Sequence, residues 1–178
     1  MKLSLIEKRI ENSETKTFIF KPEKNIKWIA GQYLIYFLPH ENQDKRGKMR
    51  FFTISSPPFE KYPSITTKIV DKSSSFKKAL DNLQINNEIE VKGPDGDFIV
   101  DKFNKNHVFI AGGIGITPFH SILKQLSFEK KQINATLFYS SRKHFVFKDE
   151  IDQIQKENPK LKVFYLNERI TENILKKN

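Results

Sequence analysis

The chain has 178 residues, of which 38% are hydrophobic and 29% are charged, and its formal net charge is +10. This composition is typical of a globular protein, and the length suffices for one medium domain or two small ones with a real core. The sequence contains no cysteine, which excludes disulfides, thiolate metal sites and a cysteine-ligated iron–sulfur cluster within this chain.

The positive charge is spread along the sequence. Nearly all the basic residues are lysines scattered among Asn, Ile and Phe, without a basic run or a nucleic-acid motif. We therefore expect no nucleic-acid partner and interpret the charge as a solvated surface, part of which can steer an acidic protein partner. No stretch approaches the about 20 apolar residues of a membrane span, and the first residues lack the apolar core of a signal peptide. The expected location is the cytoplasm.

Residues 2 to 100 have the pattern of short strands separated by polar, turn-rich segments. Their lengths and spacing predict a small antiparallel barrel. The polar segment 41–48 is expected to be a solvated connection with no chemical role. The predicted strands cover residues 3–10, 17–21, 33–38, 50–55, 64–70 and 88–92.

The strand that starts at Arg50 combines a cation, aromatic rings and hydroxyl groups. Alternate side chains of a strand share a face, so Arg50, Phe52 and Ile54 are predicted to point one way, and Thr53 and Ser55 the other. Arg50 offers a forked donor to a diphosphate, Phe52 an apolar surface to a planar ring, and Thr53 a hydroxyl and an amide to ring heteroatoms. This combination suits a flavin and its phosphates. The alternative is an ordinary barrel strand with an exposed arginine.

A polar loop at 71–75 leads into a predicted helix. Ser74 or Ser75 suits the N-cap, and free amides at a helix start attract anions. The alternative is a capped helix that only covers the open end of the barrel. The residues that share its apolar face are Phe76, Ala79, Leu80 and Leu83.

Residues 93–98 predict a turn, because Pro94 fixes one backbone angle and the glycines at 93 and 96 tolerate positive φ. The polar connector 101–106 follows. We place a domain boundary at residue 103, which gives a barrel domain at 1–103 and a second domain at 104–178.

From residue 107 the pattern changes to alternating strands and helices. The apolar run 107–111 predicts a strand buried on both faces of a parallel sheet, and a glycine loop and an amphipathic helix follow it. Strand, glycine loop and helix make a dinucleotide phosphate site plausible, with Thr117 as N-cap and Pro118 at the first helical position. The predicted contacts are Gly112, Gly113, Gly115, Thr117 and Pro118.

A second strand, 135–139, ends in the basic and hydroxyl-rich segment Ser140-Ser141-Arg142-Lys143. The carboxyl ends of strands are where α/β sheets bind ligands, so Ser140 and Arg142 are candidate binding residues; the alternative is a plain polar turn. A helix follows from about residue 147. Phe147 is a candidate either for stacking on a base or, as a helix-face residue, for the core.

Four segments, in this order, resemble motifs of the ferredoxin-NADP reductase family. They are Ala30-Gly31-Gln32-Tyr33, the pattern Arg-x-aromatic-Ser/Thr-x-x-Ser at 50–56, the turn 93–98, and the glycine loop 111–118. The sequence departs from the family at Ala30, where Pro is usual, and at Phe52, where Tyr is usual. The resemblance covers nearly the whole chain. It implies an all-β antiparallel flavin barrel followed by a truncated α/β parallel-sheet domain that binds NAD(P).

The resemblance implies a flavin oxidoreductase that passes electrons between NADPH or NADH and a one-electron carrier of the ferredoxin or flavodoxin type, or an oxygenase partner. The implied flavin is FAD, with FMN as the alternative. A rival reading is a non-catalytic flavin-binding electron-transfer or docking subunit. The implied flavin contacts are Arg50, Phe52, Thr53, Ile54, Ser55, Ser56, Lys68, Ile69, Ser74 and Ser75.

In the resembled family the loop at 140–143 holds the adenosine ribose. Because this loop is basic and contains neither Asp nor Glu, it favours a 2′-phosphate, and hence NADPH over NADH. No catalytic side chain is assigned, since hydride and electron transfer belong to the cofactor. The four histidines lack ligand spacing, so no metal is expected.

The family pattern continues further than this sequence does. After a strand at 161–166 and a helix start at Thr171, the family has another strand and a Cys/Ser-Gly-Pro loop beside the nicotinamide, and neither has a counterpart here. Without that strand, the edge of strand 107–111 is expected to be apolar and unpaired.

Overall fold

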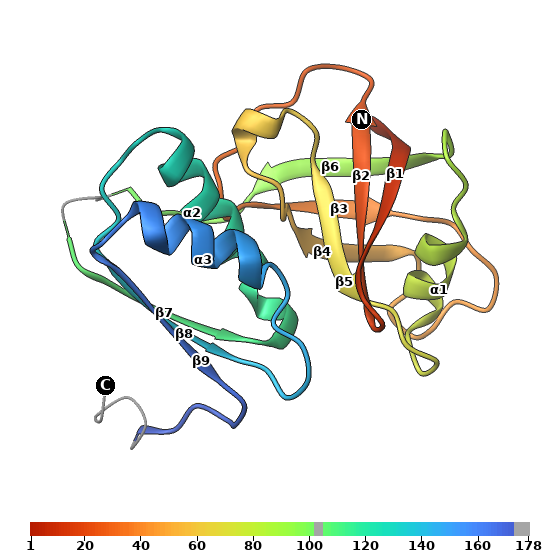
Figure 1. The fold of residues 1–178 in the computed structure, drawn as a ribbon. Coiled ribbons are helices and arrows are strands. Elements are labelled where there is room, and N and C mark those ends of the chain that lie inside the picture. Colours follow the sequence, from red (N-terminus) through yellow and green to blue (C-terminus); the bar gives the residue numbers. More distant parts are fainter. Residues whose placement is uncertain (102–104, 173–178) are drawn as a thin grey trace.

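The computed structural model describes residues 1–101 and 105–172, which form an antiparallel sheet followed by a smaller parallel sheet with helices (Figure 1). The predicted fold class is confirmed. The boundary expected at residue 103 lies outside the described residues. No helix in the described part of the chain is long and apolar enough to cross a membrane.

The first sheet has six strands in the order β4-β3-β6-β1-β2-β5. Its ends approach each other where the Ser55 N–H, just after β4, donates to the Ser64 carbonyl in β5 (3.0 Å). Apolar side chains such as Phe18, Leu34 and Tyr36 alternate into its core. The elements are β1 (Lys2–Asn12), β2 (Thr15–Pro22), β3 (Tyr33–Phe37), β4 (Met49–Thr53), the 3₁₀ turn η1 (Pro58–Glu60), β5 (Ser64–Lys68), α1 (Ser75–Asn82) and β6 (Glu88–Asp95).

Strand β6 is longer than predicted. It continues through Gly93 and Pro94 to Asp95, which pairs with Tyr33 of β3 across an irregularity in the register. Half of the segment predicted as a turn is therefore strand, because a bulge lets the ladder extend past the proline.

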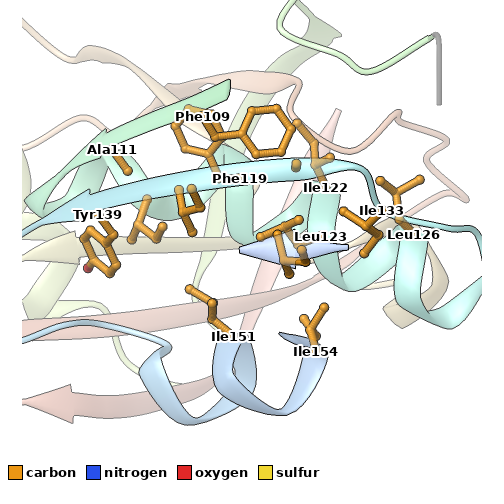
Figure 2. Close-up of a cluster of buried hydrophobic side chains, with 14 of the residues drawn as sticks. Phe109, Ala111, Phe119, Ile122, Leu123, Leu126, Ile133, Tyr139, Ile151 and Ile154 are labelled. Carbon is orange, nitrogen blue, oxygen red and sulfur yellow. The ribbon is translucent and has the colours of Figure 1, made fainter. Parts of the chain in front are cut away.

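The second sheet is parallel, in the order β7-β8-β9, and α2 and α3 lie on one of its faces (Figure 1). Figure 2 shows the core between sheet and helices, a single cluster that includes Leu123 of α2, Ile151 of α3 and Tyr139 of β8; all three are fully buried. The elements are β7 (His107–Gly112), the 3₁₀ turn η2 (Gly113–Ile116), α2 (Thr117–Phe128), β8 (Ala135–Ser140), α3 (Lys148–Glu157) and β9 (Leu161–Leu166).

Strand β7 lies at the edge of this sheet and pairs only with β8 among the described residues. Phe109 and Ala111 are buried under α2, whereas Val108 and Ile110 are 65% and 49% exposed. Among residues 1–101 and 105–172, no strand pairs with the other edge of β7. The prediction that this strand is buried on both faces is wrong, because the described helices cover one face only.

The barrel and the second sheet meet through α2. Its Ser121 hydroxyl donates to the Ser56 carbonyl (2.9 Å), and His120 Nδ1 donates to the Ser55 carbonyl (3.1 Å). Both donors are buried. The chain that leaves β4 is thus fixed to the helix that begins at the glycine loop, so the two predicted cofactor segments lie at one junction.

Candidate functional site

A cavity of about 350 Å³ lies between the end of β4, the end of β5 and the start of α1. Half of its lining residues are cations, and the pKa of Lys77 is lowered by burial and by the neighbouring charges of Arg46 and Lys68. A confined group of like charges of this kind favours an anionic ligand. The lining residues are Arg46, Arg50, Phe51, Phe52, Lys68, Val70, Lys72, Ser73, Ser74 and Lys77.

The Arg50 side chain is 10% exposed and is held by the loop before β4. Its Nη1 donates to the carbonyls of Arg46, Gly47 and Met49, and its Nη2 donates to Asp44 (2.6 Å). Segment 41–48, expected to be a solvated connection, is mostly exposed and also has a structural role, because it holds Arg50. The loop folds back because its carbonyls and one carboxylate satisfy a guanidinium that is too buried to be hydrated.

One Arg50 donor is left over. Its Nε is buried and has no hydrogen-bond partner in the described structure, and an orphaned donor of this kind calls for a ligand. The guanidinium lies 5.3 Å from the Phe76 ring centroid. Arg50 lines this cavity, and a cation-rich lining fits the diphosphate of FAD.

Phe52 lies on the same face of β4 as Arg50, as predicted. Its ring is half-buried and packs against Tyr36 (centroids 5.8 Å apart) and Phe76 (5.9 Å). Phe51, on the opposite face of the strand, is 55% exposed. Phe52 therefore offers a supported aromatic surface at the cavity for a planar ring system.

The residues after β4 are not gathered into the cavity. Ile54 is fully buried in the core, the Ser55 hydroxyl bonds to Ser64 (2.8 Å), and the Ser56 hydroxyl donates to the Tyr62 carbonyl (2.8 Å). The predicted alternation stops because the strand ends at Thr53, which is half-buried and does not line the cavity.

The segment after β5 contributes in part. Lys68 lines the cavity, but the Ile69 N–H already donates to the Glu14 carbonyl (2.8 Å). Ser74 is the N-cap of α1, as predicted, and accepts from the Lys77 N–H (3.4 Å). The hydroxyl of Ser75, by contrast, accepts from the Asp44 N–H (3.0 Å), so this serine supports the loop that holds Arg50.

A second cavity of about 330 Å³ lies at the carboxyl ends of β7 and β8. It gathers four of the predicted nucleotide contacts, Gly112, Gly113, Ser140 and Arg142. A Cβ added at either glycine would meet no atom within 4 Å, so the backbone there faces open space. The other lining residues are Glu14, Lys68, Ser141, Lys143 and Arg169.

Gly115, Thr117 and Pro118 do not line this cavity. Gly115 lies inside the turn η2, which begins at Gly113, and Thr117 is a buried first residue of α2 instead of its N-cap. The N-cap prediction fails because Ile116 is already helical, so no extended residue precedes the helix. Phe147 stacks on His120 (centroids 3.8 Å apart, planes at 14°), and its half-buried ring packs against the core.

Three residues that line the second cavity lie outside the sequence motifs that predicted this site. Arg169 follows β9, whereas Lys68 and Glu14 come from the barrel. Lys68 lines both cavities. The two candidate sites therefore adjoin at one lysine.

The carboxylate of Glu150 ties α3 to this junction. His120 Nε2 lies 3.4 Å from it and Lys124 pairs with it, and these contacts, His120 first, lower the pKa of Glu150 to about 2. Because the pKa is lowered by folding, the ionised carboxylate stabilises the fold above its ordinary pKa of 4.5. This contribution is lost as the pH falls from about 4.5 through about 2.

We expect Glu150→Gln to be less stable than the unmodified chain at neutral pH, and this difference to shrink steadily below pH 4.5. Urea denaturation at a series of pH values measures the two free energies of unfolding. Glu41→Gln, on the solvated loop, is the control and should show a small difference at every pH. The ion-pair explanation would be refuted if the difference in the free energy of unfolding between Glu150→Gln and the unmodified chain stayed constant as the pH fell to about 2, the folded pKa of Glu150.

Comparison with known proteins matches the two parts of the chain to two family models. Residues 2–99 match the family model of the oxidoreductase FAD-binding domain, and residues 109–176 match that of the oxidoreductase NAD-binding domain. The chain is 28% identical to flavohemoprotein A of Dictyostelium discoideum over an alignment 178 residues long. This alignment covers 89% of this chain and 44% of that protein. It is 30% identical to NADH-cytochrome b5 reductase 1 of the same organism over 117 residues, 64% of this chain and 41% of that protein.

The chain therefore spans less than half the length of these curated relatives. Among solved structures, it superposes on an H286K mutant of ferredoxin-NADP+ reductase from Plasmodium falciparum, in complex with 2′P-AMP, with a TM-score of 0.81. The identity is 21%, and the match covers 99% of this chain and 80% of that one. The chain belongs to the ferredoxin-NADP reductase-like family of flavin oxidoreductases, with an FAD-binding domain followed by an NAD-binding domain.

Proposed function

We propose that this chain passes electrons between NADPH or NADH and a one-electron carrier protein, of the ferredoxin or flavodoxin type or an oxygenase partner, through bound FAD. The observation that carries the proposal is the adjacency of the two cavities, which share Lys68. When bound, FAD supplies the chemistry, since a flavin accepts a hydride and gives up electrons one at a time.

In this proposal, the side chains of the first cavity bind FAD and orient its ring system. Arg50 and Lys77 offer charged donors to the diphosphate of FAD, and Ser74 adds the N-terminus of α1. Phe52 supports the ring system through its own packing on Phe76. In the second cavity, the bare backbone at Gly112 and Gly113 gives room for nucleotide phosphates.

The carrier protein is proposed to be acidic. The net charge of +10 favours encounter with an acidic surface. One relative is named as the reductase subunit of an oxygenase. It is the glycine betaine monooxygenase reductase subunit of Chromohalobacter salexigens, to which the chain is 28% identical over 165 residues. Weakening of the reaction with rising salt would support such a partner, and a salt-independent rate would count against it.

Anaerobic reduction tests the proposal. FAD-loaded chain is mixed with NADPH or NADH, the loss of flavin absorbance is followed, and a one-electron acceptor such as cytochrome c is then added. We expect the flavin to bleach and the acceptor to be reduced. Flavin that dithionite bleaches but neither nucleotide does would instead favour the non-catalytic flavin-binding subunit.

The nucleotide choice gives a further prediction. If Arg142 contacts a 2′-phosphate, Arg142→Ala should weaken the binding of 2′-phospho-AMP by about 1.5–3 kcal/mol, because a charge-assisted contact is lost. The binding of AMP should stay almost unchanged. Isothermal titration measures both affinities. Arg9→Ala, an exposed barrel arginine paired with Glu7, is the control. Equal losses for the two ligands would show that Arg142 does not discriminate.

A further inference from the structure

The nucleotide cavity contains a carboxylate that comes from the barrel. Glu14 lies in the turn between β1 and β2, where its N–H donates to Asn12 Oδ1 (2.9 Å). Its carbonyl accepts from the Ile69 N–H just after β5 (2.8 Å). These two backbone hydrogen bonds fix the turn beside the strand that carries Lys68.

The Glu14 side chain crosses to the loop that follows β8. One carboxylate oxygen pairs with Lys143 Nζ, and the other lies 3.9 Å from Lys68 Nζ. The carboxylate is 25% exposed, and the Lys143 contact, the largest cause, lowers its pKa. Next to it, the Ser13 hydroxyl lies 3.5 Å from His144 Nε2. The turn therefore forms one wall of the cavity.

This placement changes the charge balance from that of the loop alone. The residues 140–143 contain no acid, yet Glu14 is the acidic member of the lining, against the cations Lys68, Arg142, Lys143 and Arg169. A phosphate monoester carries a charge of about −1.5 to −2 at neutral pH. A carboxylate at the same wall repels it and also occupies Lys143. A ribose hydroxyl, by contrast, can donate to a carboxylate, as in sites that select NAD.

We propose that Glu14 is a specificity-determining residue of the nucleotide cavity, which disfavours a 2′-phosphate and favours a free ribose hydroxyl. It opposes Arg142, so the two residues set the balance between NADPH and NADH. The inference rests on the proposed nucleotide site and assigns part of its selectivity to a residue of the barrel.

The test is the affinity of the FAD-loaded chain for 2′-phospho-AMP and for AMP, measured by isothermal titration in the unmodified protein and in Glu14→Gln. Glutamine keeps the shape and removes the charge. We expect the ratio of the two affinities to shift about five- to tenfold toward 2′-phospho-AMP, as for removal of one nearby like charge. The shift should shrink in high salt, which screens charge but would not correct a misfolded turn.

Glu88→Gln is the matched control, because Glu88 is a barrel carboxylate paired with Lys2 (2.7 Å) outside the cavity lining. It should leave the ratio unchanged. A ratio in Glu14→Gln within about twofold of the unmodified protein, with both ligands bound, would overturn the role of Glu14 alone. Failure of both ligands to bind to any of the three proteins would overturn the nucleotide site itself, and the role of Glu14 with it.

Discussion

Arg50→Ala is expected to lose FAD during gel filtration while the barrel stays folded. Arg50 lines the cation-rich cavity and has a buried Nε–H without a partner in the described structure. Its side chain lies outside the cluster of apolar side chains that forms the barrel core. Losing one charge-assisted contact to the diphosphate costs about 1.5–3 kcal/mol, or about ten- to a hundredfold in affinity. The measurements are the ratio of FAD to protein and the affinity from flavin fluorescence.

The substitution also frees the loop that Arg50 holds, so controls must separate flavin binding from folding. Asp44→Asn keeps Arg50 and removes its ion pair, and it should retain FAD if the guanidinium itself binds the diphosphate. Arg9→Ala, at an exposed ion pair on the barrel, should change neither property. A folded Arg50→Ala protein with full FAD content would refute the assignment of this cavity.

The aromatic part of the same site gives a milder expectation. Phe52→Ala should weaken FAD binding, because the ring that packs against Phe76 is removed, whereas Phe52→Tyr should not. Flavin fluorescence titration measures both variants. Equal affinities for Phe52→Ala and the unmodified chain would mean that the ring of FAD does not rest on this side chain.

Gly31→Ala is expected to destabilise the chain by about 2–5 kcal/mol. The glycine has φ of +102°, and a Cβ there would lie 1.9 Å from the Phe98 carbonyl oxygen and 3.1 Å from Ile122 Cδ1 of α2. Backbone must move to relieve this contact, at the place where the loop before β3, the segment after β6 and α2 meet. Urea denaturation measures the loss.

Gly47→Ala is the matched control. Gly47 also has positive φ, +63°, but its nearest neighbour to an added Cβ is a flexible Gln43 side chain at 3.8 Å. It should lose only about 1 kcal/mol, the cost of the backbone conformation. Similar losses for the two variants would show that the close approach at Gly31 does not matter.

Local patterns predicted the fold because its elements follow local rules. The alternation of β4 correctly placed Arg50 and Phe52 on one face, and the glycine loop led from β7 to α2 as expected. The same rules gave a wrong N-cap for α2, because the residue before Thr117 can adopt either an extended or a helical backbone. Ile116 is helical in the turn η2, so Thr117 entered the helix instead of capping it.

The contacts that complete the two sites are not local, and a pattern along the sequence does not contain them. Lys143 and Glu14 are 129 positions apart and meet only because the β1–β2 turn lies beside the second sheet. Asp44 is six positions before Arg50, but their pairing depends on how the loop folds back. The sequence offered one indication of this pairing, an acidic residue shortly before the arginine. Such pairs of acidic and basic residues occur by chance in many polar loops.

If both cavities bind their proposed ligands, one chain holds FAD and a nucleotide at the same time in adjoining cavities. The most direct measurement is a titration of flavin-free chain with FAD, with 2′-phospho-AMP, and with each ligand in the presence of a saturating amount of the other. We predict one FAD and one 2′-phospho-AMP per chain, bound together, with Arg50→Ala losing only the first and Arg142→Ala weakening only the second. Mutual exclusion of the two ligands would mean that they share a single site, and it would contradict the account.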